Sequence, residues 1–147
     1  MADNPETLLL LDTDHLSLLQ RGGSESETLR ERLKLVAPDD YGVTIITYME
    51  QVEGRLAEIN KAQTPAAQTA AFLGLHETLT LYQTIAVWDF TPQAAALFFL
   101  LRSQKIRVGT QDLRIACIAL ANNATLLTRN QRDFERIPGL TFEDWTR

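Results

Sequence analysis

The stretch "TLLLLDTDHLSLL", residues 7–19, joins four consecutive leucines to two aspartates, Asp12 and Asp14. An apolar run of this kind is normally buried, and an ionised carboxylate is costly in such surroundings unless its charge is compensated. Residues 7–11 are therefore predicted to form a buried strand that carries Asp12 toward the interior. The question is what makes two acids tolerable at the end of this strand.

Length and composition limit the class of protein. A chain of 147 residues with 45% hydrophobic and 22% charged residues fits one globular domain with one good core. No apolar stretch approaches the roughly 18 residues that span a bilayer, and "MADNPE" lacks the basic region of a signal peptide. The single Cys117 excludes internal disulfides and a Cys-rich zinc site, and its apolar neighbours predict burial. We therefore expect a cytoplasmic protein that does not associate with membranes.

The net charge of −5 is unevenly distributed. Residues 1–100 carry 6 Lys+Arg and 14 Asp+Glu, a balance of −8, whereas residues 101–147 carry 8 and 5, a balance of +3. Either the basic residues of the second part are scattered solvated charges or they form a surface that meets phosphate. The candidates for such a surface are Arg102, Lys105, Arg107, Arg114, Arg129, Arg132 and Arg136.

The rest of the chain alternates expected strands and helices. Helices are expected at residues 24–36, 48–60, 64–81, 92–103 and 110–121, strands at 43–47, 85–90, 124–128 and 140–142, and a helical turn at 130–136. Strands separated by helices indicate a parallel sheet with right-handed crossovers and helices on both faces. The apolar, non-alternating strands fit burial on both sides. The sequence predicts one α/β/α domain over residues 1–147 with a parallel, five-stranded sheet.

Acidic residues follow several of the expected strands. Asp12 follows the first strand, Glu50 lies three residues past the second, and Asp133 lies five past "TLLT". Asp112 opens the helix that leads into that last strand. Since ligands bind at the carboxyl ends of parallel strands, these carboxylates are expected to converge on one edge of the sheet.

Most of these acids also have a local structural explanation. Thr47 and Glu50 match the Ser/Thr-x-x-Glu capping box, and Asp112 lies in the first turn of a helix, where the helix dipole favours an anion. Asp133 fits the first turn of a helix capped by Asn130. Asp12 is harder to explain in this way, because a buried strand carries it inward. The joint arrangement therefore favours a shared ligand over separate caps.

Several ionised carboxylates in one place repel one another, and a divalent cation removes that conflict. Oxygen ligands without a His–Cys set favour Mg²⁺ or Mn²⁺ over zinc. Such a site suits phosphoryl transfer, because the cation can bridge to phosphate oxygens and acidify an attacking water.

Three segments, in this order, resemble the signature segments of PIN-domain ribonucleases. They are "LLLLDTDHLSLL", "VTIITYMEQVEGR" and "VGTQDLRIACIALANNATLLTRNQRDFERIPGLTFEDW". The resemblance is strongest to the VapC-type toxins of type II toxin–antitoxin pairs and covers nearly the whole chain. Residues 55–85 are the least diagnostic part.

The resemblance implies a metal-dependent endoribonuclease with four acids in matching positions. Asp12 and Asp112 match its firmest Mg²⁺ ligands, and Glu50 and Asp133 would complete the site directly or through water. Other positions that the resemblance assigns are Gly54 four residues after Glu50, the supporting polar residues Thr13, Thr128 and Asn130, and Asp14, which is often an uncharged polar residue in relatives.

The resemblance also implies partners. Toxins of this kind usually cut structured RNA such as transfer RNA, are silenced by a cognate antitoxin protein, and commonly form homodimers. The basic residues expected to meet RNA in this chain are Arg107, Arg114, Arg129 and Arg132.

Two other functions remain open at this point. A haloacid-dehalogenase-like phosphatase also has a strand ending in Asp-x-Asp, with Asp12 as nucleophile, but it needs a late acidic pair and the only Asp-Asp pair, Asp39-Asp40, lies too early. A catalytically decayed PIN fold used as an RNA- or protein-binding scaffold would be expected to lack some of the acids. His15 is expected either to pack at a helix start or to hydrogen-bond to an acid or to RNA, and residues 98–101 are expected either in the core or at an interface.

Overall fold

The computed structural model describes residues 7–147, so the sequence "MADNPE", on which the expected absence of a signal peptide rests, lies outside the described residues. Five parallel strands form one sheet in the order β3-β2-β1-β4-β5. The strands are β1 (Leu9–Leu11), β2 (Tyr41–Thr44), β3 (Ala86–Trp88), β4 (Thr125–Leu127) and β5 (Thr141–Glu143). The predicted parallel, five-stranded α/β architecture is confirmed.

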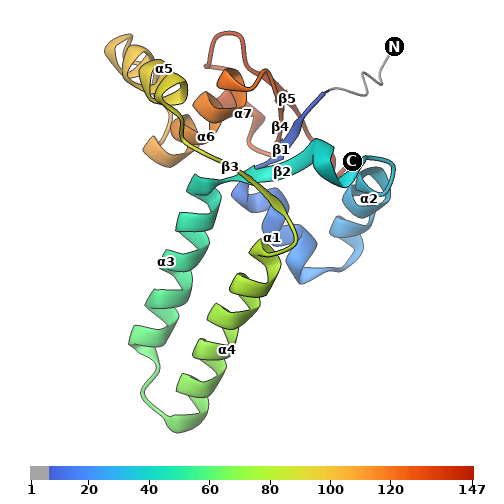
Figure 1. Cartoon of the computed structure of the whole chain (residues 1–147), viewed down its shortest axis with the longest axis vertical. Helices are drawn as coiled ribbons and strands as arrows, with labels where there is room; N and C mark the ends of the chain where they lie inside the picture. The colour runs from blue at the N-terminus through green and yellow to red at the C-terminus, as the bar shows by residue number, and fades with distance from the viewer. Residues whose placement is uncertain (1–6) are drawn as a thin grey trace.

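Helices connect successive strands and cover both faces of the sheet (Figure 1). They are α1 (Thr13–Arg21), α2 (Ser24–Leu33), the short 3₁₀ helix η1 (Pro38–Asp40), α3 (Ile45–Lys61), α4 (Pro65–Tyr82), α5 (Pro92–Ser103), α6 (Thr110–Ala121) and α7 (Gln131–Phe134). Three helices begin after a threonine whose hydroxyl accepts a backbone N–H in the first turn: Thr44, Thr64 and Thr91. Pro65 and Pro92 then occupy the first position of α4 and α5, where a missing N–H costs nothing.

The leucines of β1 are buried on both faces of the sheet, because successive side chains of a strand point to opposite faces. Leu10 points into a core formed largely by α5 and α6, and Leu9 and Leu11 point into a second core with α1 and α2. Leu10 and Leu11 are completely inaccessible. As expected, α6 is buried nearly all round, and Cys117 lies inside it with its pKa raised to about 11 by burial. Both faces of the central strand are therefore covered by apolar side chains.

The second strand and the helix after it differ from the sequence prediction. The strand was expected at residues 43–47, but β2 ends at Thr44 and α3 begins at Ile45. The Thr44 hydroxyl accepts the N–H of Thr47 at 3.2 Å and thereby starts the helix three residues earlier than the β-branched run indicates. The predicted capping box of Thr47 and Glu50 is consequently wrong, because Glu50 lies in the second turn of α3.

Helices α3 and α4 pack side by side as a long antiparallel pair that extends away from the sheet (Figure 1). Arg55 of α3 lies against Gly74 of α4, where a Cβ would come within 2.8 Å of its guanidinium, and its Nε donates to the hydroxyl of Thr78 at 3.0 Å. The pair leaves large apolar side chains exposed, among them Leu56, Phe72, Leu73 and Leu79. Within residues 7–147 no helix combines the length and apolar character needed to cross a membrane.

The strand order determines where a ligand site can form. The chain builds β1, β2 and β3 outward on one side, then crosses back past β1 to add β4 and β5 on the other side. Strand β1 is therefore the topological switch point, and open α/β sheets bind ligands beside the carboxyl ends of the strands at such a point. Asp12 follows β1 and the segment 128–130 follows β4, so the sequence motifs lie at this edge of the sheet.

Candidate active site

Asp12 is fixed from two sides at the carboxyl end of β1. Its backbone N–H donates to the carbonyl of Leu127 on β4 at 3.0 Å, and its side chain caps α1 by accepting the N–H of His15 at Oδ1, 2.8 Å away. Only 6% of the residue is exposed. A buried carboxylate with one capped oxygen and the other oxygen uncapped is well placed to take part in a ligand site.

Glu50 is held in place by a hydroxyl from α1. Thr13 Oγ1 donates to Glu50 Oε1 at 2.8 Å and lies 3.1 Å from Thr47 Oγ1. These contacts join α1 to α3 beside Asp12. Thr13 thus lies beside an acid, as the resemblance implies, and the buried Thr47 is a further contributor that the capping-box interpretation hid.

Asp112 lies in the first turn of α6, where other acids act on its carboxyl group. Burial, and after it the negative charges of Asp12, Glu50 and Asp133, together raise the pKa of Asp112 to about 6. Charges act on a group in this way only when they lie nearby. Asp12, Glu50 and Asp133 therefore lie near enough to Asp112 for their charges to act on its carboxyl group.

Asp133 is held by the loop after β4. Asn130 Nδ2 donates to Asp133 Oδ2 at 3.0 Å, and the buried Thr128 accepts the N–H of Asn130 at 2.9 Å. Asn130 precedes α7 as expected, but its side chain makes no capping bond to the helix backbone. The side chain instead fixes the carboxylate of Asp133, which corrects the predicted capping role.

Asp14, two residues from Asp12, has a different environment. Arg129 donates to both of its oxygens, Nε to Oδ2 at 2.7 Å and Nη2 to Oδ1 at 2.8 Å, and also lies 3.5 Å from Glu25. The hydrogen bond with Arg129 holds the pKa of Asp14 below its ordinary value. The charge of Asp14 is thus compensated by the chain itself.

Several of the basic residues considered for a phosphate-binding surface are engaged within the protein. Arg102 donates to the carbonyls of Ile106 and Val108 and to Thr110 Oγ1, and Arg136 donates to the carbonyl of Arg107. Arg114 donates to Gln111 and stacks over Phe98. Arg107 and Arg132 are exposed. The basic surface is therefore smaller than the count of basic residues indicates.

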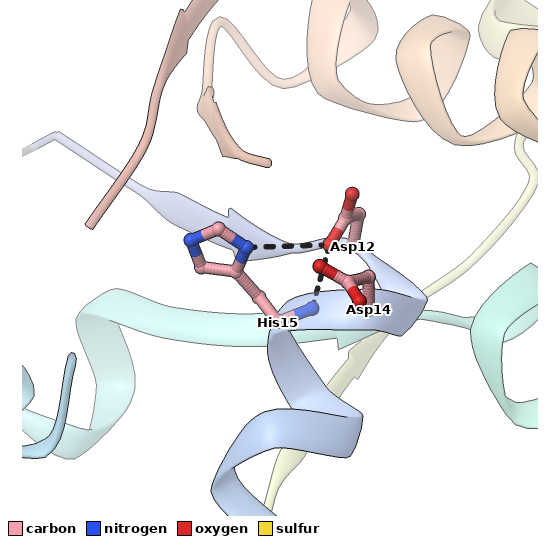
Figure 2. A group of neighbouring side chains, drawn as sticks. All are labelled: Asp12, Asp14 and His15. Carbon is pink, nitrogen blue, oxygen red and sulfur yellow. Dashed lines mark hydrogen bonds and ion pairs between the residues drawn. The ribbon is translucent and has the colours of Figure 1, made fainter. Parts of the chain in front are cut away.

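His15 is completely buried at the start of α1, which confirms the expectation that it packs there. Together with Asp12 and Asp14 it forms a group whose potential ligand atoms lie within 4.8 Å of one another (Figure 2). Its Nδ1 lies 3.5 Å from Asp12 Oδ1, and its Nε2 accepts the N–H of Trp145 at 3.3 Å. No local sequence signal could have shown the contact with Trp145, since 130 residues separate the two.

Comparisons with known proteins agree with this geometry. Residues 9–140 match the PIN domain family. Ribonuclease VapC1 of Haemophilus influenzae is 30% identical over 146 residues, which cover 95% of this chain and 99% of that protein. The tRNA(fMet)-specific endonuclease VapC of Salmonella typhimurium is 32% identical over 126 residues, covering 83% and 87%.

Solved structures show the same fold. The VapBC-1 structure from nontypeable Haemophilus influenzae superposes with a TM-score of 0.76 at 26% identity, covering 96% of this chain and 100% of that chain. The DNA-bound VapBC structure from Salmonella typhimurium gives a TM-score of 0.74 at 28% identity, covering 95% and 98%. The chain therefore belongs to the PIN-domain family, as a VapC-type nuclease of the toxin–antitoxin class.

Proposed function

We propose that this chain is a divalent-cation-dependent endoribonuclease that acts as the toxin of a type II toxin–antitoxin pair. The observation that carries the proposal is the buried Asp12 at the carboxyl end of β1, together with the effect of the charges of Asp12, Glu50 and Asp133 on Asp112. The pKa of Asp112, raised to about 6 by burial and by the other three acids, supports a shared charge that needs a counter-ion. Within residues 7–147, no lysine or arginine forms a salt bridge with these four acids.

The residues present fit Mg²⁺ or Mn²⁺. The four side chains offer carboxylate oxygens, which these hard cations prefer. When bound, the cation would supply Lewis acidity toward a phosphodiester and lower the pKa of an attacking water. In this proposal Asp12 and Asp112 are direct ligands, and Glu50 and Asp133 complete the site directly or through water.

Other side chains of the chain hold these acids in position. The hydroxyl of Thr13 fixes one oxygen of Glu50, and the amide of Asn130, itself held by Thr128, fixes one oxygen of Asp133. Each acid therefore keeps a free oxygen for the site while the other is held. Such orientation lowers the entropic cost of assembling the reacting groups.

The proposed substrate is structured RNA such as transfer RNA. The names of the relatives, Ribonuclease VapC1 and tRNA(fMet)-specific endonuclease VapC, support RNA as the substrate class. The exposed Arg107 and Arg132 are the proposed phosphate contacts, and Arg129 can join them only by leaving Asp14. Arg114 is less suited to this role, because it is partly buried against Phe98.

The proposed protein partners are a cognate antitoxin and a second copy of this chain. The similar structures from Haemophilus influenzae and Salmonella typhimurium are VapBC complexes, which supports an antitoxin. The exposed Phe99 and Leu100 on α5 are apolar side chains that an interface would cover. Gly54, in the middle of α3, has open space where a Cβ would be. A glycine there costs about 1 kcal/mol relative to alanine, and a closely approaching partner would account for it.

The test is cleavage of transfer RNA by purified protein with and without divalent cation. We expect cleavage with Mg²⁺ or Mn²⁺, none with EDTA, and recovery when excess Mg²⁺ is restored. Cleavage that persists in EDTA would contradict the metal mechanism. Hydrolysis of a small phosphoester with intact RNA would instead indicate a phosphatase, and RNA binding without cleavage would indicate a scaffold.

A further inference from the structure

We propose that His15, held in one tautomer by the backbone N–H of Trp145, positions Asp12 for cation binding without being a ligand itself. The proposal rests on the proposed function, because it takes Asp12 as part of a cation site. It extends that function to a residue from α1 and to the segment that follows β5.

The imidazole of His15 is completely buried, and a buried polar ring is costly unless its nitrogens find partners. Nε2 has a partner, because it accepts the backbone N–H of Trp145 at 3.3 Å. Nδ1 has none with hydrogen-bond geometry among the described residues, but it faces Asp12 Oδ1 at 3.5 Å. The ring therefore lies between a fixed donor and a carboxylate of the acidic cluster.

The contact with Trp145 determines which nitrogen carries the proton. A nitrogen that accepts a hydrogen bond must present a lone pair, so Nε2 is unprotonated, and a neutral imidazole then carries its proton on Nδ1. That proton faces Asp12 Oδ1. A small rotation of either side chain would bring the 3.5 Å separation into the hydrogen-bond range.

The same tautomer argues against His15 as a ligand, although it lies in a group that could hold a cation. A cation on Nδ1 would need a lone pair there, and the neutral ring would then carry its proton on Nε2, where the N–H of Trp145 already points. The two oxygens of Asp12 thus have different roles. Oδ1 takes the N–H of His15 and faces its ring, and the other oxygen is turned away from the ring (Figure 2).

The segment that supplies the N–H of Trp145 is itself held firmly. The guanidinium of Arg32, from α2, lies 4.3 Å from the centre of the Trp145 ring, and Trp145 Nε1 donates to Glu143. Asp144 Oδ1, 3.8 Å from His15 Nε2, accepts both the N–H and the hydroxyl of Thr146. Asp144 is therefore satisfied by its own turn, and the N–H of Trp145 remains directed at His15.

The tautomer is the first quantity to measure. Long-range ¹H–¹⁵N NMR spectra of the whole protein distinguish the two neutral tautomers from the imidazolium, and a His76→Gln variant assigns the signals, because the chain has 2 histidines. We expect the Nδ1–H form of His15 at pH 7.5. A proton on Nε2, or on both nitrogens, would overturn the proposal.

Two substitutions of His15 then separate positioning from packing. The amide nitrogen of Asn lies close to the place of Nδ1, so His15→Asn retains a donor toward Asp12, whereas His15→Leu retains only bulk. Removing an outer-shell partner typically lowers metal affinity by about 10–100-fold. We expect that loss of Mn²⁺ affinity in calorimetry for His15→Leu, and a loss within about threefold for His15→Asn. Equal losses in both folded variants would overturn the proposal.

Two variants at residue 145 test the hydrogen bond from the N–H of Trp145 to His15 Nε2 while leaving His15 intact. Trp145→Pro removes the N–H, and Trp145→Ala removes the ring but keeps the N–H. Mn²⁺ affinity and the tautomer signal should change only in Trp145→Pro, with thermal unfolding confirming that both variants fold. Equal effects in both variants would show that the N–H of Trp145 does not hold His15 in its tautomer. Absence of Mn²⁺ binding in the unsubstituted protein would count against the proposed function, whereas normal binding that no variant disturbs would count against His15 alone.

Discussion

Asp12 and Asp14 are two residues apart, yet only the charge of Asp14 is balanced by a cationic side chain of the protein. Asp14 projects to the surface with 42% of its side chain exposed and receives two hydrogen bonds from Arg129. Asp12 is buried beside other acids, and a backbone N–H caps one of its oxygens. The chain neutralises the accessible acid with its own arginine and leaves the buried one without a cationic partner that is permanently charged.

This difference separates a structural acid from a functional one better than sequence position does. A buried carboxylate without a counter-ion lowers stability, so a protein retains such a group mainly where the charge is used. We therefore expect the change of Asp to Asn to have different effects at Asp12 and at Asp14.

The largest effect is expected for Asp12→Asn. The substitution preserves shape and hydrogen bonding at the start of α1 but removes one anionic oxygen from the cluster. Loss of about 3 kcal/mol of transition-state stabilisation would lower RNA cleavage by about 100-fold or more. Cleavage rates with Mg²⁺ and the circular dichroism spectrum check it. A folded variant with normal activity would show that the site has been misassigned.

The next effect concerns Asp112 and pH. Its pKa of about 6 in the folded protein exceeds the ordinary value of 3.8, so the folded state of the cation-free protein binds the proton more tightly than the unfolded chain does. The contribution of Asp112 to the free energy of unfolding is therefore largest below about pH 4. Up to about 3 kcal/mol of it is lost as the pH rises through 6.

Chemical unfolding in EDTA across pH 4–7.5 measures this loss. Asp112→Asn should remove most of the pH dependence and make the cation-free protein more stable than the unsubstituted protein at pH 7.5. Mg²⁺ should stabilise the unsubstituted protein more at pH 7.5 than at pH 5, because binding requires the ionised carboxylate. A flat profile in EDTA would contradict the crowding of the four acids.

A smaller effect is expected for Thr13→Val, which removes the hydroxyl that holds Glu50. Loss of one partly buried hydrogen bond is worth about 1 kcal/mol, so cleavage should fall about fivefold. Thr13→Ser, which keeps the hydroxyl, is the control and should retain nearly full activity. If Val and Ser behave alike in cleavage assays, Glu50 does not depend on this contact.

The smallest effect is expected for Asp14→Asn, which breaks the pair with Arg129 without touching the four acids. Both side chains are more than one-third exposed, so the pair should contribute about 0.5 kcal/mol or less to the free energy of unfolding. Cleavage should change by less than about threefold, measured beside Asp12→Asn. A comparable loss in the two variants would mean that the released Arg129, or Asp14 itself, takes part in the reaction.

The architecture could be predicted because it depends on patterns that local physics reads directly, and the same patterns suggested the four acids as a site. Four leucines in a row require a strand covered on both faces, and carboxylates after parallel strands meet at one edge. The start of α3 was missed because Ile45 and Ile46 favour a strand, while the Thr44 cap determines the helix start.

Pairings between distant side chains could not be predicted. Arg129 was counted as an RNA contact, but tertiary structure places it 2.7 Å from Asp14, 115 residues away in the chain. The contact of His15 with Trp145 was missed for the same reason. Neither sequence segment contains a pattern that specifies its partner.

The placement of β1 between β2 and β4 has a consequence for folding. The segment through β3 supplies Asp12 and Glu50, and the later segment supplies Asp112 and Asp133, so the proposed site requires the two segments to dock. That docking pairs Leu9 with Thr125, a contact between residues far apart in the chain and hence slow to form. Nuclease activity should therefore appear with the slowest phase of folding. It should disappear as soon as the pairing of β1 with β4 is lost, even where most helices remain.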